Sequence, residues 1–341
     1  MRYYLWLWLW LSLLASPRGA QAGGALTCFA DERQAFRRSV SSLLAAERFD
    51  ELESKAEALR HGKPRFSSGA PVLFDFYEGL NPVSDHVARN ERQRYHGLLE
   101  KWVAQRPTSL TPRIPLIREQ MALAWESRGE GWAGTVTTDG WTGFEARSTE
   151  GWRLGNEALR MKLQDPALYD VLLALGVGLD KPRSELESLF AKGIALDPGF
   201  DHLYVVMSRY LMPRWHGTPQ EFERLASRAA SVTKGTLGDG LYARVAAEGL
   251  LLYGGGDFTT LSPALPWGRL KGAFADLDRA FPDSSLIVNV FCALALRYGD
   301  VATARSLFER IDGHWSADSS DVWRSRARFE AARARADKPR P

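Results

Sequence analysis

The sequence is poor in residues that bind metal ions. Its 341 residues include only six histidines and two cysteines. No two histidines stand in the H-E-x-x-H pattern or at another short spacing that would place two ligands on one helix face. We therefore expect no metal site.

The two cysteines, Cys28 and Cys292, are too few for a disulfide framework, although two cysteines can pair in an oxidising compartment. Cys292 lies inside an apolar segment, where burial should raise the pKa of its thiol. Cys28 lies close to the N-terminal end. We expect a buried free thiol at Cys292 and a mobile one at Cys28, with pairing as the alternative.

Motifs for catalysis and for cofactor binding are also scarce. Neither G-x-S-x-G nor a Walker sequence occurs. Residues 129–134 (GEGWAG) match the dinucleotide fingerprint G-x-G-x-x-G. That fingerprint requires a strand before the glycines and a helix after them. Here an expected helix precedes them and a threonine-rich stretch follows, so the pattern indicates a helix stop and no bound cofactor.

Charge of a single sign does not dominate. The chain has 44 basic and 41 acidic residues, and its formal net charge is +3. Arg2 and Arg18 lie in a segment that we expect to be removed, so the remaining chain is nearly neutral. A nucleic-acid site needs basic residues gathered on one face. The most basic stretch, 324–340, is interrupted by acidic residues, so we expect no nucleic-acid partner.

The one long hydrophobic run is at the N-terminus. Arg2 precedes an apolar segment, Tyr3–Ala15, and Ala20-Gln21-Ala22 supplies a small-x-small cleavage pattern. A membrane-spanning helix needs about 20 apolar residues. We therefore predict a signal peptide over 1–22, no membrane span after its removal, and a periplasmic or secreted protein. A lipoprotein is the alternative because Cys28 follows the signal, but Thr27 fits the lipidation pattern poorly.

What the sequence does contain is helical periodicity. Residues 168–230 hold four apolar-periodic segments separated by short turns. Asp165-Pro166 and Asp197-Pro198 stand 32 residues apart, close to the tetratricopeptide period of about 34. Thr218-Pro219-Gln220-Glu221 is a capping box. We predict an all-α domain over 23–341, a tetratricopeptide-like α-α superhelix, with further hairpins over 251–336 and a tail over 337–341. Within it, the pattern predicts single helices over 85–105, 144–163 and 319–336 and a loop over 257–267.

A family resemblance supports this fold. The residues that carry it are 124–129 (AWESRG), Gly140-Trp141 with Phe144, Asp165-Pro166 with Tyr169, Asp197-Pro198, and 210–217 (YLMPRWHG). Together they resemble the bacterial family of domains of unknown function numbered 4034, over 29–250. The resemblance implies a tetratricopeptide-type helical protein and assigns no reaction.

Two tryptophan-bearing stretches are candidate sites. Trp132 and Trp141 lie in the glycine-rich stretch 129–143, and Arg214, Trp215 and His216 lie between two expected helices. Aromatic rings beside turns can stack on a ligand, and more often they fill gaps between packed helices. An arginine and a tryptophan at such a corner can hold a peptide carboxylate. We favour the structural interpretation of this corner, in which Trp215 packs under the next hairpin and Arg214 caps the carbonyls at a helix end.

The leading functional hypothesis is a scaffold in the cell envelope that binds a protein or peptide partner on the surface of stacked hairpins. The alternative is an envelope enzyme, or an enzyme accessory, that acts on cell-wall glycans through a site in the stretch 129–143.

Overall fold

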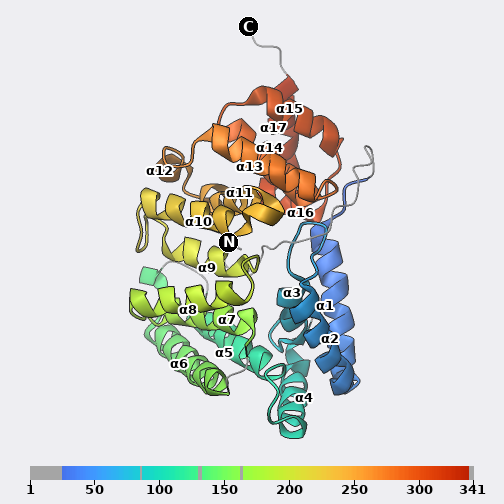
Figure 1. Cartoon of the computed structure of the whole chain (residues 1–341), viewed down its shortest axis with the longest axis vertical. Coiled ribbons are helices and arrows are strands. Elements are labelled where there is room, and N and C mark those ends of the chain that lie inside the picture. The colour runs from blue at the N-terminus through green and yellow to red at the C-terminus, as the bar shows by residue number, and fades with distance from the viewer. Residues whose placement is uncertain (1–24, 85–86, 130–132, 162–163, 338–341) are drawn as a thin grey trace. The chain divides into compact units, whose positions relative to one another are not determined.

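The structure, a computed structural model, describes residues 25–84, 87–129, 133–161 and 164–337. These residues form seventeen α-helices, and an isolated parallel bridge joins Thr27 to Ser284 (Figure 1). The predicted all-α class is therefore confirmed. The predicted signal peptide, 1–22, and Trp132 lie outside the described residues.

The described chain divides into two compact units. The first comprises 33–64 and 71–206, and the second comprises 25–32, 65–70 and 207–337. The helices that lie mainly in the first unit are α1 (Phe29–Ala45), α2 (Phe49–Gly62), α3 (Val72–Leu80), α4 (Arg92–Gln105), α5 (Arg113–Arg128), α6 (Thr138–Arg160), α7 (Pro166–Gly178), α8 (Arg183–Leu196) and α9 (His202–Tyr210).

Helices that follow one another in the first unit pack together: α5 on α6, α6 on α7, and α7 on α8. Glycine lets α6 and α7 approach closely, because a Cβ at Gly155 would lie 2.4 Å from Leu172 Cδ2. The helix starts use local capping. The Thr137 side chain accepts from Gly140 N to start α6, and Asp165 accepts from Ala167 N to start α7, with Pro166 at its first position.

The second unit holds the remaining helices. These are α10 (Pro219–Leu237), α11 (Gly240–Ala247), α12 (Phe258–Leu261), α13 (Trp267–Ala280), α14 (Ser285–Arg297), α15 (Val301–Ile311), α16 (Ala317–Trp323) and α17 (Arg326–Asp337). A π-helical turn, Glu248–Leu252, and a 3₁₀ turn, Tyr253–Gly255, follow α11. The predicted cap at Thr218 is confirmed, since its side chain accepts from Glu221 N.

The second unit also includes the start of the described chain. Thr27 N donates to Asp283 O (2.7 Å), and Ser285 N donates to Thr27 O (3.1 Å). The Asp318 carboxylate accepts from Phe29 N (2.9 Å) and from Ala30 N (3.1 Å). The first turn of α1 is therefore capped by a side chain from the far end of the sequence, and Cys28 lies within this anchored segment.

Both cysteines are free thiols. Cys292 is buried in α14, and burial raises the pKa of its thiol, as predicted. Cys28 is partly buried, and burial raises the pKa of its thiol as well, with the nearby Asp318 carboxylate adding to the effect. The expectation that Cys28 is mobile does not fit its position between two hydrogen-bonded neighbours.

Several predicted boundaries are wrong. The helix expected from Asp85 begins at Arg92, and α6 begins at Thr138, so Trp141 is helical. The stretch 257–267 was expected to be a loop, but it contains α12. The single helix expected over 319–336 is two helices, because Arg324 adopts φ 68° and ends α16.

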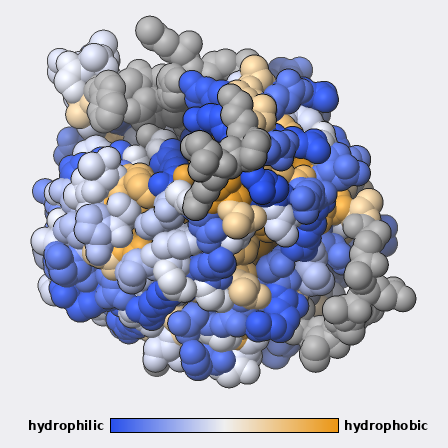
Figure 2. Space-filling view, turned by 90° about the horizontal axis from the view of Figure 1, so that it is seen from above, coloured by the Kyte–Doolittle hydropathy of each residue, from blue (hydrophilic) through white to orange (hydrophobic). Residues whose placement is uncertain are grey.

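On the face drawn in Figure 2, hydrophilic side chains predominate, and hydrophobic ones appear as small separate patches. Among the described residues, the large hydrophobic side chains that are exposed are Trp141, Trp215 and Val232. Isolated exposed apolar residues are ordinary, so an exposed tryptophan gains interest only from its neighbours.

Candidate functional site

The residues between α9 and α10, Tyr210–Gly217, form a tight corner in the second unit. Leu211 and Met212 are buried and anchor it. Trp215 N donates to Met212 O (2.8 Å), and Gly217 packs so closely that a Cβ there would lie 2.2 Å from Leu211 O. Because the backbone folds back onto its buried anchor, residues 214–216 face outward.

Arg214, Trp215 and His216 are all exposed at this corner. Trp215 is 50% exposed, so the expectation that its ring is packed beneath the next hairpin is wrong. The backbone of 211–217 closes on itself and leaves the indole outside. His216 stacks on Tyr210, with ring centroids 4.6 Å apart and planes at 16°.

The Tyr253 ring lies beside two guanidinium groups. Arg214 Cζ is 5.1 Å from the ring centroid, and Arg209 Cζ is 5.0 Å from it. Arg214 Nη2 also donates to Tyr253 O (2.9 Å), the carbonyl directly after the π-helical turn Glu248–Leu252. Arg209 is paired with Glu248 (2.7 Å), whereas Arg214 has no carboxylate within ion-pair distance among the described residues.

These contacts give the corner a definite chemistry. We name the exposed residues Arg214, Trp215 and His216, with Tyr210 and Tyr253 beneath them, the 214–216 corner. It presents the exposed indole of Trp215 and, one residue earlier in the chain, a guanidinium whose charge no nearby carboxylate balances among the described residues. Such a pair suits a ligand with an apolar group beside a carboxylate.

Trp141 belongs to the first unit and lies on a second aromatic surface. Arg128 Cζ lies 5.4 Å from the Trp125 ring centroid and 5.1 Å from that of Trp141. Phe144 packs edge-on against both rings, at 5.1 Å and 5.9 Å. Trp141 is 40% exposed, so it contributes to packing and also presents part of its ring to solvent. Asp139, in the first turn of α6, is exposed.

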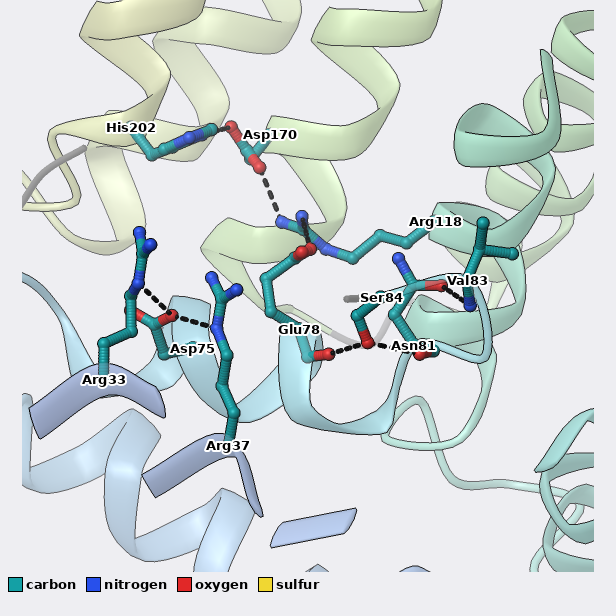
Figure 3. Close-up of polar contacts among 10 residues, drawn as sticks. All are labelled: Arg33, Arg37, Asp75, Glu78, Asn81, Val83, Ser84, Arg118, Asp170 and His202. Carbon is teal, nitrogen blue, oxygen red and sulfur yellow. Dashed lines mark hydrogen bonds and ion pairs between the residues drawn. The ribbon is translucent and has the colours of Figure 1, made fainter. Parts of the chain in front are cut away.

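The most charged interior site of the first unit was not predicted (Figure 3). Arg118, on α5, bonds Glu78 of α3 through Nη1 (2.8 Å) and Asp170 of α7 through Nη2 (2.7 Å). His202, on α9, bonds Asp170 through Nδ1 (2.7 Å). We name Glu78, Arg118, Asp170 and His202 the buried charge cluster.

Asp75, also on α3, forms a neighbouring ion pair. It accepts from Arg37 Nε (2.5 Å), and Arg33 lies 3.9 Å away (Figure 3). Burial raises the pKa of Asp75, and the two arginines only partly offset this, while Glu78 adds to the rise. The carboxylates of α3 therefore face cations on both sides of the helix.

The buried charge cluster is enclosed, since none of its residues is more than 5% exposed. Its hydrogen bonds join α3, α5, α7 and α9, so the geometry fixes how helices of the first unit stand against one another. The sequence does carry a signal for this cluster, namely a charged residue inside an otherwise apolar segment, which must find a partner when the segment is buried. Glu78 lies in VLFDFYEGL, Arg118 in IPLIREQM and Asp170 in ALYDVLLAL.

Asp170 should make the stability of the fold depend on pH. Burial alone would raise the pKa of Asp170, but His202 and Arg118 outweigh it, so the pKa lies below its ordinary value. A carboxyl group with a lowered pKa stabilises the fold above its unfolded pKa of about 3.9 and loses that contribution as the pH falls through its folded pKa. The difference in free energy of unfolding between the wild type and Asp170→Asn should therefore become smaller below about pH 4.

Melting temperatures of both proteins between pH 7 and pH 3 measure this gap. A gap that stays constant over the whole range would contradict the role of ionised Asp170. Asp75→Asn is the control. The pKa of Asp75 is raised, so its carboxyl group stabilises the fold at low pH, and this stabilisation is lost as the pH rises. The effect of Asp75→Asn on stability should therefore depend on pH in the opposite direction.

Comparison with known protein families, with curated proteins and with solved structures finds no match for this chain. Among the helices in the described ranges, none is both long enough and apolar enough to cross a membrane.

Proposed function

We propose that the protein is an exported, tetratricopeptide-like scaffold of the bacterial envelope that binds a protein or peptide partner through the 214–216 corner. Support for stacked hairpins comes from the second unit, where α14 packs on both α15 and α16, and α15 packs on α17. Contacts between a helix and the next two along the chain are what stacked hairpins require. The signal-like N-terminus supports export, and the resemblance to family 4034 supports the repeat fold.

The observation that carries the binding proposal is the exposed indole of Trp215, preceded in the chain by Arg214, whose guanidinium has no carboxylate partner among the described residues. Tryptophan and arginine are enriched among residues that dominate binding energy at protein interfaces. The backbone of the corner is already closed by its own hydrogen bonds, so little ordering is required when a ligand arrives. The ligand that fits is a peptide with a carboxylate next to an apolar side chain.

Trp215→Ala should weaken peptide binding at least about tenfold without a large loss of stability, because a hot-spot tryptophan contributes about 2 kcal/mol or more and half of this ring is already in solvent. The measurement is a screen of the purified protein against a peptide library with free C-terminal carboxylates, followed by titration of the best ligands. Arg214→Gln should weaken the same peptides.

Trp141→Ala is the matched control, since it also removes an exposed indole, from the other unit. Amidated copies of the same peptides test the carboxylate. If Trp215→Ala binds every selected peptide as tightly as the wild type, or if amidation has no effect, the proposal fails.

A further inference from the structure

A pocket of about 260 Å³, lined mainly by polar and charged residues, lies in the first unit. Glu53 and Arg60 of α2, Arg106 at the end of α4, the segment 108–111 and Gln164 line it. Leu110 is the only apolar residue in this lining. The volume suits a ligand of about the size of an amino acid or a monosaccharide, below the range of about 300–1,000 Å³ for drug-sized ligands.

Glu53 is held in one orientation at the edge of this pocket. Its Oε1 accepts from Trp102 Nε1 (2.9 Å), and its Oε2 accepts from Thr111 Oγ1 (2.7 Å). Trp102 and Thr111 are buried, so both donors are fixed by packing. Neither donor is charged, and no cation lies within ion-pair distance of Glu53 among the described residues.

The two arginines of the pocket already have carboxylate partners. Arg60 Nε donates to Asp165 (2.6 Å), and its Nη2 donates to Tyr77 Oη and to Thr111 Oγ1 (both 2.8 Å). Arg106 is paired with Asp50 on the surface. Asp165 and Asp50 are the ion-pair partners of these arginines, and Glu53 adds only a smaller electrostatic contribution, after that of Asp50, to the raised pKa of Arg106. Glu53 is therefore the carboxylate of the pocket that has no ion pair of its own among the described residues.

We infer that this pocket binds a small ligand that carries a protonated primary amine, with the ammonium group on Glu53. Each carboxylate oxygen of Glu53 accepts one hydrogen bond and retains a second lone pair for the ammonium. The hydroxyls of Thr108 and Ser109 and the amide of Gln164 stand in the same lining and suit hydroxyl or carboxylate oxygens of the ligand. Amino sugars and free amino acids share this chemistry.

The supporting network is typical of a preorganised site. Arg60, Tyr77, Thr111 and Asp165 come from α2, α3, the segment before α5 and the start of α7, and their mutual hydrogen bonds fix the back of the pocket. A site built in this way binds without reorganisation, because its hydrogen-bonding groups are already in place. The inference does not depend on the 214–216 corner.

Isothermal titration of the purified full chain tests the inference with methylammonium, D-glucosamine, N-acetyl-D-glucosamine, glycine and tetramethylammonium. We expect at least one primary amine to bind, and we expect N-acetylglucosamine and tetramethylammonium not to bind, since one lacks the charge and the other lacks N–H donors. Binding of glucosamine without glycine points to amino sugars, and the reverse points to amino acids.

Glu53→Gln keeps the shape of the side chain and one acceptor for Trp102 but removes the charge, so it should weaken binding at least tenfold. Glu57→Gln, an exposed position one turn along α2, is the matched control and should bind as the wild type does. Thr108→Trp, at an exposed position that lines the pocket, should block binding without touching Glu53.

Three outcomes would overturn the inference: no primary amine binds, the acetylated and free amino sugars bind equally, or Glu53→Gln binds as tightly as Glu57→Gln. Melting temperatures of the three variants show whether each is folded. If Glu53→Gln does not fold, Thr108→Trp is compared with the wild type instead, and equal binding of the primary amine by these two proteins overturns the inference.

Discussion

Arg118→Met is expected to lower the free energy of unfolding by about 3–5 kcal/mol, the usual loss when one partner of a buried ion pair is removed. Methionine preserves much of the side-chain volume but leaves Glu78 buried without its cation and Asp170 with His202 as its remaining partner. It also removes the guanidinium that lies 4.6 Å from the centre of the Phe74 ring. Urea unfolding followed by circular dichroism measures the loss.

Arg153→Met is the matched control. Arg153 bonds two carboxylates on α6, Glu150 and Glu157, but all three side chains are exposed, each over 42–52% of its surface. Exposed ion pairs contribute only about 0–1 kcal/mol. Equal losses for Arg118→Met and Arg153→Met would show that the buried charge cluster does not hold the first unit together.

Asp165→Ala is expected to lower the free energy of unfolding by about 3–5 kcal/mol, because the cap of α7 is lost and the partly buried Arg60 loses its carboxylate partner. The carboxylate caps α7 through Ala167 N (2.8 Å), a role that contributes about 1 kcal/mol. It also accepts from Arg60 Nε and from Tyr77 Oη (2.5 Å), and it is completely buried.

Thr137→Ala provides the comparison, since Thr137 caps α6 as Asp165 caps α7. The Thr137 hydroxyl accepts from Gly140 N (3.1 Å), and Thr137 is exposed. Its loss should cost only about 1 kcal/mol in the same urea unfolding measurement. If both substitutions cost the same, the contacts of Asp165 with Arg60 and Tyr77 contribute nothing beyond the cap.

Local sequence patterns predicted the helices and their ends well. The cap at Thr218, the start of α7 at Asp165-Pro166 and the stop at Gly129 depend on residues within a few positions of one another. Burial of Cys292 followed from the apolar segment around it. In these cases the interactions that decide the structure lie within one turn of helix.

The features that were missed depend on residues far apart in the chain. Arg118 and Asp170 are 52 residues apart, and Arg60 and Asp165 are 105 apart. A helical pattern places an arginine on a face of its own helix, but it does not say which carboxylate lies opposite. The pocket at Glu53 likewise requires Trp102 and Thr111 to come against α2.

The exposure of Trp215 was missed for a different reason. Its ring type favours burial, and the sequence gives no sign that Leu211 and Met212 take the buried positions of the corner instead. Which of several apolar neighbours enters the core depends on how the backbone turns. Here the contact of Gly217 with Leu211 decides the turn, and only the fold reveals it.

The capping of α1 by Asp318 has a consequence for the timing of biosynthesis. The partners of Thr27, Phe29 and Ala30 lie at 283–285 and at Asp318, and Ala30 and Asp318 are 288 residues apart. A ribosome that adds about 5–20 residues per second needs roughly 15–60 s to cover that distance. The buried charge cluster has all its members once His202 has emerged. The start of α1 therefore remains uncapped in the nascent chain long after the charges of the first unit can pair.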